Sequence, residues 1–293
     1  MRKFQLFFIV IVTLLACIFF FQKTSDERTA KETITYFPLD PNVEFLDKKT
    51  VLSSPNQVND GYELQLNSMS RLNKSAYLRH DISFLFANGK LVGKIGKWAE
   101  NTDIIEDQLK MSLNHNELLR AITFHHAEIH SNSDQITSSQ TMSEDDLYVI
   151  QTNLPSLISF KSPSTEEEIG WKEVLDKKED EAIRLAIQNA EENFGIDLDF
   201  YHIIPLTDLP NYEKKGLPSF SKEQSKQIIG RLMEGLYKNY FLGIKTNNGK
   251  IISPINSTIP IILLAKNREH LMIIIQTQTG ETIRLIQNIP RVN

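Results

Sequence analysis

The sequence predicts an α+β protein, with mixed helices and a mainly antiparallel sheet, that follows one N-terminal transmembrane helix. The chain opens with a long uncharged apolar run. Several later segments alternate apolar and polar residues around short turn dipeptides, as antiparallel strands do. Between them, apolar residues recur every three to four positions, which is the period of an amphipathic helix.

The composition is that of a globular protein. The chain has 293 residues, of which 24% are charged and 41% are hydrophobic, and these fractions lie far from those of disordered chains. The sequence pI is about 5.9, so no basic field attracts nucleic acid. We expect no nucleic-acid partner and no cofactor.

The first 23 residues predict a membrane anchor. No charged residue occurs between Lys3 and Lys23. A helix over residues 4–22 would span roughly 28 Å at about 1.5 Å per residue, close to the thickness of a bilayer core. Arg2 and Lys3 precede the run, so the positive-inside rule places the N-terminus in the cytoplasm and the remaining chain outside the cell membrane.

Two other interpretations of this segment stay open. A cleaved signal peptide would have a shorter apolar region followed by a small-residue site, whereas "IFFFQK" follows the only small pair here. A lipoprotein signal is the other interpretation, because "LLAC" at residues 14–17 resembles a lipobox with Cys17 as the lipidated residue. Four more apolar residues follow Cys17, although a lipobox usually ends the apolar region. All three interpretations place the body of the protein outside the cytoplasm.

The region beyond the anchor is acidic and contains no cysteine. Without Arg2, Lys3 and Lys23, 29 basic and 37 acidic residues remain, which is a net charge of −8. Because Cys17 is the only cysteine, this region must rely on its hydrophobic core and not on disulfides. Its composition, rich in Ile, Lys and Asn, is similar to that of envelope proteins of low-GC Gram-positive bacteria.

We expect three parts after the anchor. Residues 24–60 are polar and contain three prolines, which predicts a stalk. A helix-initiating "SPSTEEE" marks a boundary near residue 163. It divides the folded part into two expected α+β lobes, residues 61–162 and residues 163–293.

In the first expected lobe, residues 76–98 form the clearest hairpin. Asn88-Gly89 lies at its centre, and this dipeptide suits a type I′ turn. Residues 101–122 predict a helix that begins at Asp103 and carries apolar residues at helical spacing. Strands are then expected at residues 121–130 and 146–152.

The second expected lobe contains two amphipathic helices and a strand-rich C-terminal third. Gly195 ends the first helix and Ser221 caps the second. The runs "IPIILLA" and "LMIII" are continuous and apolar, which indicates strands that are buried on both faces.

The stretch "AITFHHAEIH" at residues 121–130 holds the candidate site residues. On a strand, His126, Glu128 and His130 share one face and His125 lies on the other. Imidazole and carboxylate groups can bind zinc, copper or nickel. A solvated strand edge would show the same pattern, so we expect no metal here. His80 and Asp81 are a second candidate, but neighbours on one strand point to opposite faces and cannot pair directly.

The expected function follows from an anchor, a stalk and an outer domain that lacks familiar catalytic motifs. HExxH, GxSxG, GxxxxGK[ST] and GxGxxG are all absent from the sequence. We expect a membrane-anchored binding or interaction module of a bacterial cell envelope, which contacts the membrane through residues 4–22 and has another envelope protein as a partner. The alternative is an envelope hydrolase or metal-dependent enzyme that uses the face of His126, Glu128 and His130.

Overall fold

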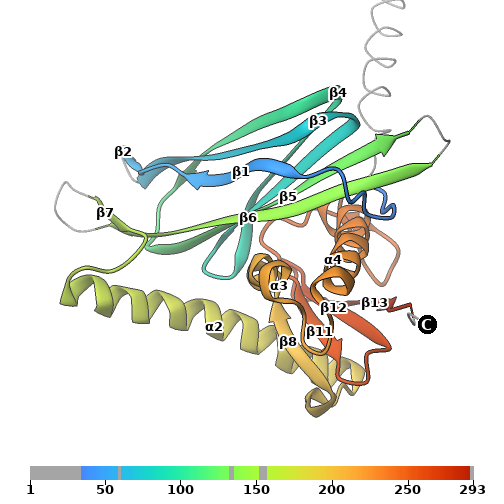
Figure 1. Cartoon of the computed structure of the whole chain (residues 1–293). Coiled ribbons are helices and arrows are strands. Elements are labelled where there is room, and N and C mark those ends of the chain that lie inside the picture. The colour runs from blue at the N-terminus through green and yellow to red at the C-terminus, as the bar shows by residue number, and fades with distance from the viewer. Residues whose placement is uncertain (1–33, 59–60, 132–134, 152–156, 291–293) are drawn as a thin grey trace, which may run out of the picture. The chain divides into compact units, whose positions relative to one another are not determined.

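The computed structural model describes residues 34–58, 61–131, 135–151 and 157–290 (Figure 1). The expected anchor and Cys17 lie outside these ranges. Within the described ranges, no helix combines the length and apolarity that a membrane span requires. Residues 34–293 group into one compact unit.

The chain is mixed α+β with a mostly antiparallel sheet, as the sequence predicts. The strands are β1 Phe45–Leu52, β2 Asn56–Val58, β3 Gly61–Ala87, β4 Lys90–Leu113, β5 Glu117–His130, β6 Ile136–Gln151, β7 Leu157–Phe160, β8 Tyr201–Pro205, β9 Ile244–Lys245, β10 Ile251–Ile252, β11 Ile261–Ala265, β12 His270–Gln276 and β13 Thr282–Asn288. The helices are α2 Glu166–Phe194, α3 Leu209–Lys215 and α4 Lys222–Leu236, with short helical turns η1 Leu198–Phe200, η2 Leu206–Asp208 and η3 Tyr237–Phe241.

The larger sheet folds back on itself at a bend in β3. On one side β3 pairs with β4 along most of its length, and the register shifts between Arg71 and Ala76. On its other side β3 pairs first with β1 and, beyond the bend, with β5. The bend lays β1 over β5 and β6 (Figure 1), where the Thr50 hydroxyl lies 2.6 Å from the Ser143 hydroxyl. The two halves of one bent sheet therefore pack face to face and enclose the side chains between them.

The smaller sheet lies between two helices and has the order β13-β12-β11-β8. On one face, Ile262 and Ile273 pack with Ile229 and Leu232 of α4. On the other face, its side chains pack with Ala186 and Ala190 of α2, and Figure 1 shows α2 continuing along β6 toward β7. The ion pair between Arg120 Nε of β5 and Glu179 Oε1 of α2, at 3.0 Å, ties α2 to the larger sheet.

The largest core cluster crosses the expected lobe boundary. It joins Phe84 and Phe124 of the larger sheet to Leu232 of α4 and Ile273 of β12. Packing of the helix layer against both sheets therefore buries apolar surface from both halves of the chain at once. The division into two lobes at residue 163 is not confirmed.

The helix predicted for residues 101–122 is wrong, because these residues form the second half of β4 and the start of β5. Ile105, Leu109 and Leu113 lie four residues apart, a spacing that keeps side chains on one face of a helix and also of a strand. Met111 shows that the segment is a strand. It lies between Leu109 and Leu113 at the two-residue spacing of a strand, packs in the same apolar cluster and pairs with Leu64 of β3.

Two other ranges differ from expectation. Residues 45–52, within the range predicted as a stalk, form β1 and pair with β3. The strand expected at residues 146–152 begins earlier, because residues 136–145 also belong to β6. Its polar residues Thr141 and Ser143 point into the folded sheet. Thr141 accepts a hydrogen bond from the Lys48 ammonium, and Ser143 bonds to the His125 imidazole.

Several local predictions are confirmed. Asn88 (φ 46°) and Gly89 (φ 82°) form the turn between β3 and β4. Gly195 follows α2 in the left-handed conformation. Ser221 caps α4 in a capping box with Gln224. In each case a short-range backbone requirement selects the residue type.

Two glycines of α4 provide a matched test of this packing. A Cβ at Gly230 would lie 2.2 Å from Gln140 Oε1, whereas a Cβ at Gly235 would meet nothing closer than 3.8 Å. Gly235→Ala should raise the free energy of unfolding by about 0.5–1 kcal/mol through helix propensity. Gly230→Ala should lower it by roughly 1–2 kcal/mol, because Gln140 must give up its bond to the Lys226 carbonyl.

Urea denaturation of the detergent-solubilised full chain measures both changes. Equal stabilisation by the two substitutions would contradict the close contact between α4 and β6.

Candidate functional site

The structure does not bring the three candidate metal ligands together in one site. His126 is buried against the core, with its ring 6.1 Å from that of Phe124. Glu128 accepts a hydrogen bond from His130 near the end of β5, where His130 also stacks on Tyr77. Among the residues that the structure describes, no group of three or more His, Cys, Asp or Glu side chains is placed to hold a metal ion.

The dipeptides His80-Asp81 and His125-His126 face each other across β3 and β5. The register pairs Asp81 with His125 and His80 with His126. His125 Nδ1 lies 2.6 Å from Asp81 Oδ2, and both side chains are almost fully buried at 0% and 2% exposure. Sequence reasoning missed this pair because it considered Asp81 only with its neighbour on the same strand.

A chain of polar groups continues from this pair. His125 Nε2 lies 2.8 Å from Ser143 Oγ. A proton on Nδ1, donated to Asp81, leaves Nε2 free to accept the serine hydroxyl hydrogen. This order of serine, imidazole and carboxylate is the one in which a general base activates a nucleophile.

Asp81 also has cationic and hydroxyl partners. Ser70 donates a hydrogen bond to Asp81 Oδ2 at 2.6 Å. Arg79 donates to Ser70 at 2.5 Å and to the Asp103 carbonyl at 2.7 Å. These bonds compensate part of the large cost of burying the charges.

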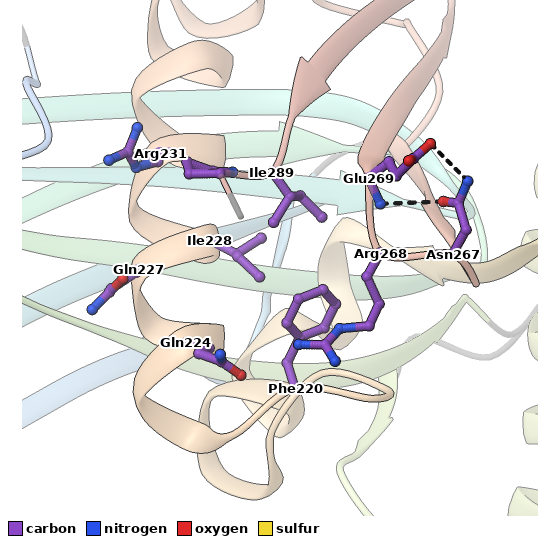
Figure 2. Close-up of a pocket in the computed structure, with 10 residues that line it drawn as sticks. Phe220, Gln224, Gln227, Ile228, Arg231, Asn267, Arg268, Glu269 and Ile289 are labelled. Carbon is purple, nitrogen blue, oxygen red and sulfur yellow. Dashed lines mark hydrogen bonds between the residues drawn. The ribbon is translucent and has the colours of Figure 1, made fainter. Parts of the chain in front are cut away.

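A cleft of 470 Å³ lies between α4 and the turn that joins β11 to β12. Figure 2 shows Phe220, Ile228 and Ile289 pointing into the space between these elements. Its polar lining residues are Gln224, Gln227, Arg231, Asn267, Arg268 and Glu269. Its volume is within the usual range of small-molecule sites, roughly 300–1,000 Å³.

Arg268 stands out among the residues of the cleft. Its φ of 65° is in the left-handed region, which costs a non-glycine residue on the order of 1 kcal/mol. Its guanidinium carbon lies 4.8 Å from the centroid of the Phe220 ring. An arginine is therefore held over the apolar floor at a position where glycine or asparagine would be less strained.

Arg268 is the cation that faces the floor of the cleft. Arg231 and Gln227 project from the flank of α4 that faces away from Arg268, and Glu269 turns toward Asn267 (Figure 2). Neither arginine forms a salt bridge with any described residue, although Arg231 stacks on Tyr36. The sequence predicts the helix that Ser221 caps, but nothing in it places the turn of Arg268 beside that helix.

The comparisons with known proteins give no match. No family model matches the chain, and no curated protein or solved structure does so significantly.

The buried imidazoles make the fold sensitive to acid. Burial lowers the pKa of His80 to about 4 and that of His126 to about 4, and for His126 the neighbouring His80 adds to the effect. The ordinary value is about 6.5. Between these values the unfolded chain binds protons that the native state does not bind, so stability is lost as the pH falls from 6.5 to 4.

His126→Gln tests this sensitivity. The wild-type full chain should lose roughly 3 kcal/mol more unfolding free energy between pH 7 and pH 4 than the variant. Glu179, whose pKa burial raises to about 7, acts in the opposite direction in both proteins and cancels in the comparison. Urea titrations across this pH range provide the measurement, with exposed His115→Gln as the control. Parallel pH profiles for wild type and His126→Gln would show that His126 does not titrate as a buried group.

Proposed function

We propose that the chain is a single-pass membrane-anchored binding module of a bacterial cell envelope, with the cleft beside Arg268 as its binding site. Residues 1–23 serve as the anchor, with the N-terminus in the cytoplasm and the folded unit outside. The observation that carries the binding role is the apolar floor of the cleft with a strained, stacked arginine above it. Backbone strain at a rim residue is typical of a site kept for function and not for stability.

We also propose that the folded unit consists of two lobes. Residues 61–162 act as a lobe built on the larger sheet, and residues 163–293 as a lobe of helices and the smaller sheet that carries the cleft. The membrane is one partner, through residues 4–22, and another envelope protein is the second. If Cys17 is lipidated, the acyl chains replace the helix as the anchor and the folded unit stays outside.

Cysteine labelling tests the topology and the binding role together, because the chain has a single natural cysteine. In a Cys17→Ala background, Gln224→Cys places a thiol on the side of α4 that faces Phe220 and Arg268 (Figure 2), and Lys250→Cys places one elsewhere on the surface. A membrane-impermeant maleimide should label both variants on intact, wall-stripped cells. Labelling only after lysis would contradict the external location.

The same two variants report on the cleft. A small-molecule extract of the cell envelope should slow the labelling of Gln224→Cys by at least about threefold, since a bound ligand covers the thiol. Labelling of Lys250→Cys should keep its rate. Equal rates with and without extract at both positions would contradict the binding role.

As a second candidate we propose an envelope hydrolase, and the Ser143–His125–Asp81 geometry is what favours it. Here Ser143 Oγ attacks the substrate carbonyl carbon, the C=O electron pair moves to the oxygen, and the serine proton passes to His125 Nε2. The bond to the leaving group then breaks as the carbonyl re-forms, and His125 gives its proton to the leaving group. Water releases the acyl group from Ser143 in the same way, while Asp81 holds the imidazole in the required tautomer. The alternative through His126, Glu128 and His130 has no comparable support, because His126 faces the core.

A fluorophosphonate probe tests the hydrolase. The native full chain should be labelled at Ser143, with loss of fluoride. Ser143→Ala should abolish the adduct, and His125→Gln should slow its formation by a factor on the order of 10² or more. Exposed Ser159→Ala is the control. An unlabelled native chain would remove this candidate and leave the binding module unaffected.

A further inference from the structure

We infer that the cleft beside Arg268 binds a small amphipathic anion, with one carboxylate or phosphate head and an apolar chain. This inference rests on the proposed binding role and adds the chemical class of the ligand. It joins two properties of the cleft that are independent of each other, the apolar floor and the cationic turn.

The floor requires an apolar group on the ligand. Phe220, Ile228 and Ile289 come from the loop before α4, from α4 itself and from the segment after β13, and they converge on one space (Figure 2). Phe220 is only partly buried against the core, so its ring remains available to a ligand. An alkyl chain on this floor would remove apolar surface from water on both sides of the contact.

The head must be anionic because of how Arg268 is held. A guanidinium that stacks on a ring uses its flat face, so its N–H donors in the plane stay free for a second partner. Arg268 makes no hydrogen bond or ion pair to another described residue through these donors, whereas Arg79 and Arg120 are each paired with carboxylates. Carboxylate and phosphate oxygens match this planar fork of donors.

The turn fixes the arginine before any ligand arrives. The Arg268 amide donates to the Ala265 carbonyl at 2.9 Å, which closes the turn. The Glu269 amide donates to Asn267 Oδ1 at 3.2 Å, which fixes the residue after Arg268. A side chain fixed in advance loses less conformational entropy on binding, which gives a physical reason for an arginine at a strained position.

The surrounding charge supports an anion. Arg268 is the cation that faces the floor of the cleft, and Glu269, the one lining carboxylate, turns toward Asn267 (Figure 2). The chain as a whole carries a net charge of −5. A locally positive cleft on a negative protein attracts an anion only at that place, and salt weakens the attraction.

The test uses the full chain in nanodiscs of neutral phospholipid and isothermal titration calorimetry, with empty nanodiscs subtracted. Octanoate and octyl phosphate should both bind. Octanol lacks the charge, while acetate and inorganic phosphate lack the chain, so each of these should bind at least about tenfold more weakly. Preference for octyl phosphate over octanoate assigns a phosphate head, and the reverse preference assigns a carboxylate head.

Arg268→Gly is the decisive variant because glycine adopts the same φ without strain. It should keep the thermal midpoint of the wild type and weaken octanoate binding by about ten- to hundredfold, since a charge-assisted hydrogen bond is lost. The octanoate affinity of Arg268→Lys should lie between those of the wild type and Arg268→Gly, since lysine keeps the charge and lacks the planar fork of donors. Arg284→Ala is the matched control, because Arg284 also stacks on a ring, that of Phe194 at 4.6 Å, away from this cleft.

Three results would overturn the inference: octanol binding as tightly as octanoate, inorganic phosphate binding as tightly as octyl phosphate, or unchanged octanoate affinity in Arg268→Gly. Such results leave the binding role unaffected if envelope extract still protects Gln224→Cys from labelling. Loss of that protection would contradict the binding role itself. Failure of the ligand class and failure of the binding role therefore give different results.

Discussion

The fold depends on the bend in β3 and on the buried polar cluster that the bend encloses. Beyond the bend, Asp81 bonds to His125 of β5, and through Ser70 it is also tied to the part of β3 before the bend. Burying these groups is unfavourable unless each finds its partner. The cluster therefore disfavours other registers of β1, β3 and β5, since a slip of one residue would move Asp81 and His125 to the opposite face.

Two apolar clusters flank this polar layer inside the folded sheet. One contains Leu66, Leu85 and Leu119, and the other contains Leu72 and Ile129. Hydrophobic burial thus drives the two layers together at both ends, while the polar layer specifies their alignment in the middle. The same layer contains the Ser143–His125 contact, so a structural network and the geometry of the hydrolase candidate use the same residues.

The cleft has a different physical origin. It forms where α4, packed on the smaller sheet through Ile229 and Leu232, runs beside the turn that carries Arg268. The sheet and helix are rigid because their apolar faces are shared with the large core. The turn can therefore hold a residue in an unfavourable backbone conformation, since the surrounding packing offsets the cost. This combination of rigid walls and one strained polar residue makes the cleft a better candidate for binding than the separated histidines of β5.

The sequence by itself determined the local features. The Asn88-Gly89 turn, the Thr165 and Ser221 helix starts, Gly195 at a helix end and the buried strands near the C-terminus all follow from short-range backbone chemistry and apolar runs. It also determined the α+β class. Only the tertiary structure decided that residues 101–113 are a strand, because their four-residue apolar spacing fits both a helix and a strand until β3 pairs with them. Likewise, Asp81 meets His125, and Arg268 meets Phe220, across distances in the chain that no local pattern encodes. Register and packing set those contacts, and they depend on the whole core forming at once.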